Sequence, residues 1–147
     1  MSEMIWLKIK KLKQDAIIPQ YSTKGSVAFD ISSLEKYALA PDRLIMVHTG
    51  LAVAIPEGYE MNVRARSGLS LKYPNYVAIA GGGTVDSDYR GEIIVPVYNH
   101  TDETWVIEKG DRIAQCIVSP IVRCLFDEVI ELDETERNTG GFGSTGK

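Results

Sequence analysis

Short stretches in which apolar and polar residues alternate constrain this chain more than any other feature. The alternation is clear over 5–10 and 59–66, and a period of two is typical of a strand with one wet face. Further β-branched runs follow, most of them bounded by turn residues such as those at 56–58 and 109–111. These runs cover residues 51–55, 77–80, 92–98, 104–107, 113–118 and 129–132. The pattern predicts an all-β sandwich or barrel.

Helix is expected to be minor. Only residues 67–72 favour a helical turn, which Pro74 soon ends. The 147 residues suffice for one domain with a core of its own. We expect this domain to span residues 1–136 and a flexible arm to follow at 137–147, because the glycine-rich arm cannot pack a core by itself.

Composition excludes several classes of function. Sixteen basic and twenty acidic residues give a net charge of −4, which argues against a broad basic surface for a nucleic acid polymer. Apolar runs are too short for a membrane span, and lysines occupy the N-terminal segment where a secretory signal would be apolar. A cytoplasmic location is expected, or the host cytoplasm or nucleus for a viral protein. Two isolated cysteines and two isolated histidines predict neither a disulfide framework nor a zinc site.

The glycines near the C-terminus suggest a phosphate-binding segment. Residues 141–147 match the spacing G-x-x-x-x-G-K, but a Walker motif also needs a buried strand before it and a helix after it, and the sequence offers neither. Exposed backbone N–H groups, the hydroxyls of Ser144 and Thr145, and the charge of Arg137 could still bind phosphate. Phe142 could stack on a base. A disordered tail is the alternative.

A second glycine cluster, Gly81–Gly83, leads into a turn rich in carboxylates. Asp86 and Asp88 match the first and third positions of a calcium-binding EF-hand, but Arg90 replaces an oxygen ligand and no helices flank the loop. The segment instead predicts a hairpin whose glycines let the backbone approach a flat ligand, with Asp86 as a candidate general base. An ordinary turn is the alternative.

The end of the strand expected near residue 64 could bind phosphate. Alternation places Arg64 and Arg66 on one face, and Ser67 could cap the helical turn while free N–H groups point outward. A solvated arginine face is the alternative. Two further features are weaker. Small residues precede Asp30, and the polar Gln115 lies inside an apolar strand, where a buried amide must find a hydrogen-bond partner.

In this order, the five segments resemble the five sequence motifs of the trimeric dUTP pyrophosphatase (dUTPase) family. They read GSVAFDI, RSGLS, GGGTVDSDYRGEI, GDRIAQCIV and RNTGGFGSTG, and extend from Gly25 to Gly146. The resemblance implies an all-β fold, a distorted jelly-roll barrel with one short helix. It also implies a homotrimer in which motifs one, two and four of one subunit, motif three of a second and the C-terminal arm of the third form each active site.

The implied reaction is the hydrolysis of dUTP to dUMP and pyrophosphate, with Mg²⁺ held mainly by the triphosphate. Such a reaction limits uracil incorporation into DNA and supplies dUMP for dTMP synthesis. The implied partners are dUTP and two further copies of the chain, with no nucleic acid polymer and no membrane.

The resemblance further implies roles for individual residues. Asp86 matches the carboxylate that orients and deprotonates the attacking water, a role suited to in-line attack at phosphorus. Tyr89 matches the ring that packs under the deoxyribose and leaves no room for a 2′-hydroxyl. The residues that match the uracil pocket lie on the hairpin and the strand after it: Gly83, Thr84, Val85, Asp86 and Ile94.

The remaining roles concern the phosphates. Asp30 matches an acid that supports the metal indirectly, through water. The phosphate corner is implied for Arg66, Ser67 and Gly68, with Gln115 as a further phosphate or water contact. In the arm, Arg137 is expected to reach the γ-phosphate and Phe142 to cover the base. The expected donors to phosphate oxygens are Gly143, Ser144 and Thr145.

Three positions depart from the family pattern. Ala28 stands where Gly is usual, Ala65 where Pro is usual, and Ala80 where many members carry an Asn whose amide helps to hold the base. Two other functions remain open. One is that of dCTP deaminase, which shares the fold but needs a deaminating Glu beside the pyrimidine. The other is a non-catalytic trimer that binds a regulatory partner.

Overall fold

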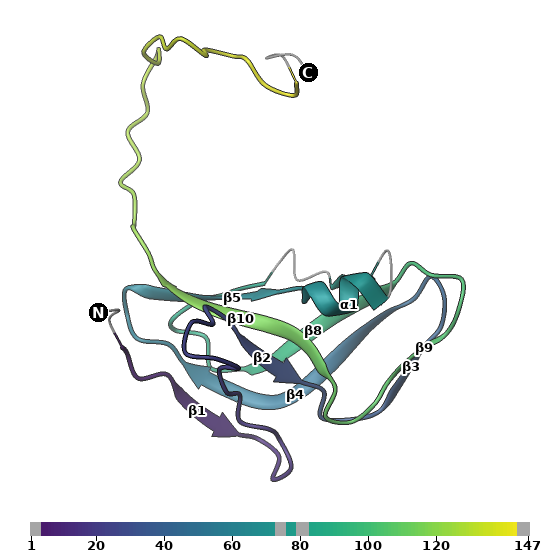
Figure 1. Ribbon diagram of the computed structural model, residues 1–147. Coiled ribbons are helices and arrows are strands. Elements are labelled where there is room, and N and C mark those ends of the chain that lie inside the picture. Colours follow the sequence, from purple (N-terminus) through teal and green to yellow (C-terminus); the bar gives the residue numbers. More distant parts are fainter. Residues whose placement is uncertain (1–3, 73–75, 79–82, 144–147) are drawn as a thin grey trace.

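The computed structural model describes residues 4–72, 76–78 and 83–143, which form ten strands and one short helix (Figure 1). The prediction of an all-β chain with a single helix at Ser67–Lys72 is confirmed for these residues. That helix is far too short and too polar to cross a membrane. The elements are β1 Lys8–Lys11, β2 Phe29–Ser32, β3 Tyr37–Leu39, β4 Leu44–Ala54, β5 Tyr59–Arg64, α1 Ser67–Lys72, β6 Tyr76–Ala78, β7 Thr84–Val85, β8 Glu92–Asn99, β9 Trp105–Ile107 and β10 Arg112–Pro120.

The strands form two antiparallel four-stranded sheets and a two-stranded ribbon. One sheet has the order β1-β4-β8-β6 and the other β2-β10-β5-β7, while β3 pairs with β9. Strands that are distant in the sequence are neighbours in both sheets, as in a jelly roll. The core lies where the inner faces meet, and buried side chains alternate along β8, as is usual for a strand with one face in a core. Its fully buried members include Leu39, Val47, Met61, Val95, Val97, Ile107 and Ile113.

The pairing of β4 with β8 contains a β-bulge. The register runs from Leu44 opposite Tyr98 to His48 opposite Ile94, and resumes with Ala52 opposite Glu92, so residues 49–51 face Ile93 alone. Gly50 makes this possible. Its φ is +69°, and a Cβ there would lie 3.0 Å from the Cβ of Ala16. The bulge was not predicted, and neither was the strand over residues 44–50, where the sequence alternation is weak.

The strand predicted over residues 129–132 is not formed, and that prediction is wrong for this chain. The side chains of Ile130 and Leu132 are exposed to solvent, and no neighbouring strand of the described residues is available to pair with this segment. A strand without a partner leaves its N–H and C=O groups unpaired, so apolar residues alone do not hold it. After β10 the chain leaves the barrel and does not fold back onto it (Figure 1). The predicted domain boundary at residues 136 and 137 stays a prediction.

Candidate active site

The hairpin predicted around Asp86 is not formed, because β7 pairs with β5 whereas β8 belongs to the other sheet. The segment that connects β7 to β8 lines a cavity of about 310 Å³, which we call the hairpin pocket. The pairing with β5 fixes the start of this segment, because the N–H of Val63 donates to the carbonyl of Gly83 at 2.7 Å. The lining is mostly apolar, as suits a flat ring. Of the residues predicted for base and sugar, Gly83, Thr84, Val85, Tyr89 and Ile94 meet here. Asp86, which was also predicted for the base, does not line this pocket. Ala80, Gly81 and Gly82 lie outside the described residues. The lining residues are Met46, Val63, Gly83, Thr84, Val85, Tyr89, Glu92, Ile93, Ile94 and Pro96.

Tyr89 is held at the edge of the hairpin pocket by two backbone groups. Its N–H donates to the carbonyl of Asp86 at 3.1 Å, which closes the turn, and its hydroxyl donates to the carbonyl of Glu92 at 3.0 Å. The ring lies over Gly91, where a Cβ would overlap the ring and the hydroxyl. Gly91 is therefore needed for the position of Tyr89, a requirement that the sequence analysis missed.

Asp86 lies on the other side of the same turn. Its carboxylate is exposed and lines a groove of about 680 Å³ together with Asp88, Arg90 and Arg123. A carboxylate that orients and deprotonates water must be open to water, and this position satisfies that requirement. The turn thus separates the two functional side chains, with the Tyr89 ring in the hairpin pocket and Asp86 in the groove.

A third cavity, of about 310 Å³, brings together three of the sequence motifs and is called the corner cavity. It lies where β2, β10 and the start of α1 approach one another. The five residues predicted for phosphate and metal support from these motifs all line it: Asp30, Arg66, Ser67, Gly68 and Gln115.

Ion pairs and a side-chain amide order the corner cavity. Arg66 donates from Nε to Oδ1 of Asp30 at 2.9 Å and from Nη1 to the carbonyl of Arg112 at 3.0 Å. Arg112 donates to the second oxygen of Asp30 at 3.3 Å. Gln115 donates to the carbonyl of Ala65 at 2.7 Å, so the amide inside the apolar strand has found its partner.

The prediction that strand alternation places Arg64 and Arg66 on one face needs correction. β5 ends at Arg64, whose side chain is exposed, and Arg66 lies beyond the strand. The Asp30 carboxylate holds Arg66 in the corner cavity, where 21% of its side chain is exposed. The ion pair, and not the period of the strand, therefore orients Arg66.

The described residues contain no group of three or more His, Cys, Asp or Glu side chains that could enclose a metal ion. Within that part of the chain, a metal would have to bring most of its ligands with it. Asp30 is nevertheless able to support such an ion through water, because an ionised carboxylate has about four acceptor positions and the two arginines use one on each oxygen.

The arm lies away from the barrel (Figure 1), and none of its described residues lines the three cavities. Arg137 is folded into a local turn, in which its Nε donates to the carbonyl of Gly140 at 2.8 Å. Phe142 is fully exposed and has a positive φ of 50°, which an L residue seldom adopts. Gly143 follows at φ +88°, and Ser144 and Thr145 lie outside the described residues. In a single chain, Arg137, Phe142 and Gly143 do not reach the cavities.

A family model identifies the family of the chain. Residues 14–146 of the chain match the model of dUTPase. The chain belongs to the dUTPase family. Curated relatives support this over nearly their full lengths. The deoxyuridine 5'-triphosphate nucleotidohydrolase of Nautilia profundicola is 49% identical over 141 residues, 96% of this chain and 99% of the relative. That of Helicobacter pylori strain Shi470 is 44% identical over 140 residues, 95% of this chain and 96% of the relative.

Solved structures of phage dUTPases have the same fold. A mutant dUTPase of Staphylococcus bacteriophage 80alpha with dUpNHpp superposes with a TM-score of 0.89 at 28% identity, covering 98% of this chain and 100% of the other. A mutant dUTPase from phage phi11 of S. aureus, described for the coordination of a structural Mg(II) ion, gives 0.78 at 26% identity and covers 86% and 98%. The predicted dUTPase-type barrel and the predicted hydrolase of dUTP are confirmed, whereas the roles of single residues stay predictions.

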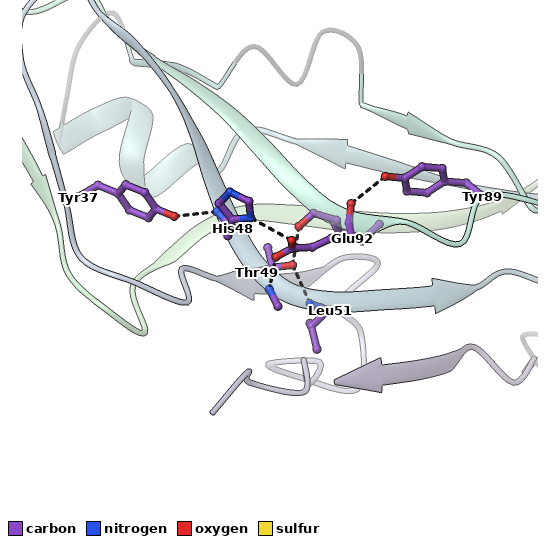
Figure 2. A network of polar contacts seen from close by, with 8 residues as sticks. Tyr37, His48, Thr49, Leu51, Tyr89 and Glu92 are labelled. Atoms are coloured by element: carbon purple, nitrogen blue, oxygen red, sulfur yellow. Dashed lines mark hydrogen bonds and ion pairs between the residues drawn. The ribbon is translucent and has the colours of Figure 1, made fainter. Parts of the chain in front are cut away.

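The sequence analysis missed a polar network behind the hairpin pocket of this dUTPase (Figure 2). The Glu92 carboxylate accepts hydrogen bonds from Nδ1 of His48 at 2.9 Å and from the N–H of Gly50 at 2.8 Å. Burial raises the pKa of Glu92, but these two hydrogen bonds, together with the charges of His48 and Lys13, outweigh it, and the pKa lies below its usual value. No local pattern marks this pair, because the register of β4 against β8 brings the two residues together.

Proposed function

We propose that this dUTPase binds dUTP and hydrolyses it to dUMP and pyrophosphate with the residues of its three cavities. One observation carries the proposal. The chain presents an apolar hairpin pocket for a base and sugar, an exposed carboxylate on the turn beside that pocket, and a corner cavity with an oriented arginine for phosphates. The cytoplasm is the proposed location, where the product dUMP would enter dTMP synthesis.

Base and sugar would bind in the hairpin pocket. The backbone from Gly83 to Val85 approaches a flat ring without large side chains, and the aliphatic wall at Ile93 and Ile94 covers its face. The Tyr89 ring would lie under the deoxyribose, where a 2′-hydroxyl would meet it. Selection of the sugar then rests on the position of one ring that two backbone hydrogen bonds hold.

The phosphates would bind in the corner cavity of another copy. Arg66 is already oriented by Asp30 and the carbonyl of Arg112, so little side-chain freedom is lost when it meets an anion. Ser67 and Gly68 lie beside it and would offer a hydroxyl and backbone N–H groups. Gln115 holds the backbone at Ala65 and would contact a phosphate or its water.

Asp86 would accept a proton from a water molecule that attacks the α-phosphorus. The water oxygen forms a bond to phosphorus, the bond from that phosphorus to the bridging oxygen of the β-phosphate breaks, and pyrophosphate leaves. The triphosphate brings Mg²⁺ with it, and the ion supplies neutralisation of phosphate charge. Asp30 would support the ion through water while it fixes Arg66.

A homotrimer is part of the proposal. The segment that follows β10 carries exposed apolar side chains on a chain that leaves its own barrel (Figure 1), and such exposure favours burial against another protein surface. Arg137, Phe142 and Gly143 would then reach a site on a neighbouring copy, together with Ser144 and Thr145. The fully exposed side chains of this segment include Leu125, Phe126 and Ile130.

A deamination reaction is disfavoured by the hydrogen bonds of Glu92. Among the described residues that line the hairpin pocket, Glu92 has the one carboxylate, and each of its oxygens already accepts a hydrogen bond, one from His48 and one from Gly50. The test is to incubate the protein with dCTP and with dUTP in the presence of Mg²⁺ and to measure ammonia and pyrophosphate. We expect pyrophosphate from dUTP and no ammonia from dCTP. Ammonia without pyrophosphate would overturn the proposal.

A further inference from the structure

Glu92 contacts both the β-bulge of β4 and the Tyr89 side chain. Its carboxylate, on one side, accepts from His48 and from the N–H of Gly50, inside the β-bulge of β4. Its backbone carbonyl, on the other side, accepts from the hydroxyl of Tyr89 at 3.0 Å. Figure 2 shows the chain of contacts running from Tyr37 through His48 and Glu92 to Tyr89. One residue thus connects the bulge to the ring at the edge of the hairpin pocket.

The bulge depends on side chains for its hydrogen bonds. Because three residues of β4 face one of β8, the regular ladder is interrupted there. The Thr49 hydroxyl donates to the carbonyl of Ile93 at 2.6 Å, and the Glu92 carboxylate accepts the N–H of Gly50. On the far side, the carbonyl of Gly50 accepts from the N–H of Leu12 at 2.7 Å. The Glu92 side chain therefore replaces a missing ladder acceptor and fixes the first residue of β8.

The Tyr89 ring has few other restraints. Its side chain is 46% exposed, so packing covers only part of it, and Gly91 beneath it offers no side chain. Its hydroxyl has the Glu92 carbonyl as its described acceptor. A shift of the backbone at Glu92 would move this acceptor and with it the ring. The Glu92 side chain fixes that backbone through the hydrogen bonds that its two oxygens accept from His48 and Gly50.

We propose that Glu92 is a positioning residue that sets the discrimination between deoxyribose and ribose by holding the Tyr89 ring in place. The inference rests on the proposed function of the hairpin pocket. It predicts that Glu92 acts on sugar choice through Tyr89 and not on the proton transfer at Asp86, which lines the groove on the other side of the turn.

The test compares dUTP with UTP as substrates of Glu92→Ala, Glu92→Gln and Glu108→Ala, with Mg²⁺ present. Glu92→Ala is expected to lower the ratio of kcat/KM for dUTP to that for UTP about tenfold, mainly through KM. Glu92→Gln should regain most of the ratio, because its amide oxygen can accept from Gly50 and its NH₂ group can donate to neutral His48. Glu108, whose exposed side chain pairs with Lys36, serves as the control and should leave the ratio unchanged.

Two outcomes would overturn the inference. The first is a Glu92→Ala protein with a lower Tm and an unchanged ratio, since Glu92 would then be structural only. The second is a Tyr89→Phe protein with an unchanged ratio, because this variant removes the hydroxyl that donates to the Glu92 carbonyl. The Tyr89→Phe variant also tests the inference if the Glu92→Ala chain fails to fold. Equilibrium binding of dUMP and UMP gives the same comparison without turnover. A wild-type protein that binds dUMP in preference to UMP but hydrolyses no dUTP would contradict the proposed function alone.

Discussion

Asp86 and Arg66 line different cavities of the chain. Asp86 faces the groove beside the turn that it forms with Tyr89, and Arg66 lies in the corner cavity with Asp30, Ser67 and Gly68. The proposed reaction needs the carboxylate at the α-phosphate and the guanidinium on the same triphosphate. This requirement is the reason for proposing that the two cavities meet across copies of the chain.

Asp86→Asn is expected to lower kcat for dUTP by at least about a thousandfold, because the amide cannot take a proton from water. Binding of dUTP should change little, since Asp86 is not among the residues that line the hairpin pocket. Steady-state kinetics and calorimetric titration measure the two effects. Asp88→Asn, which removes a second exposed carboxylate from the same groove, is the matched control and should retain most of the rate. Turnover near the wild-type rate in Asp86→Asn would exclude Asp86 as the base.

Mixed trimers should regain activity from two inactive parents. In a trimer refolded from equal amounts of Asp86→Asn and Arg66→Ala chains, about one quarter of the shared sites receive the intact Asp86 of one chain and the intact Arg66 of another. Pyrophosphate release by the mixture is therefore expected at about that fraction of the wild-type rate. Each variant refolded alone is the control. A mixture as inactive as its parents, with a trimeric mass on light scattering, would place both residues on one chain.

Asp30→Asn should weaken the use of dUTP by releasing Arg66. The amide keeps the shape of the carboxylate but loses the charge that holds Arg66 at 2.9 Å and Arg112 at 3.3 Å. We expect kcat/KM to fall about tenfold, equivalent to about 1.4 kcal/mol. Glu108→Gln breaks the exposed Lys36 pair and should leave kcat/KM unchanged. If Asp30→Asn behaves like Glu108→Gln, the corner cavity does not depend on this ion pair.

Removal of the residues after Arg137 should abolish most turnover without affecting the barrel. None of the core side chains comes from the described part of the arm, and Phe142 is fully exposed, so the Tm is expected to stay within a few degrees. Kinetics with dUTP and thermal unfolding followed by circular dichroism measure the two effects. Phe142→Ala in the full-length chain removes the proposed stacking on the base and keeps the proposed contacts of the arm with the phosphates, so it separates the two effects. A large fall in Tm on truncation would contradict a purely functional arm.

The local features of the fold could be predicted from the sequence. Period-two alternation predicts β5, a β-branched run predicts β8, and residue types predict the turn at Asp86. The five motifs placed Asp30, Arg66 and Gln115 in one site, and the structure brings all three into the corner cavity. The strands and the turn could be predicted because each rests on neighbouring residues. The shared site could be predicted because the motifs resemble those of the dUTPase family.

Features that depend on register or on another chain could not be predicted. The contact of His48 with Glu92 exists because a bulge shifts β4 against β8, and no local sequence signal states that shift. The sequence does not show that Gly91 must lack a side chain, because this requirement comes from the Tyr89 ring that lies above it. The strand expected at 129–132 failed for the opposite reason, because apolar residues predict burial but do not specify which surface provides it.

The most direct test of dUTP hydrolysis at this site is a pyrophosphate-release assay with dUTP, UTP, dTTP and dCTP, each with Mg²⁺. The hairpin pocket and the Tyr89 ring predict rapid release from dUTP alone, with UTP rejected at the sugar, dTTP at the 5-methyl group and dCTP at the base. Equal rates with dUTP and UTP, or no pyrophosphate from dUTP, would contradict it.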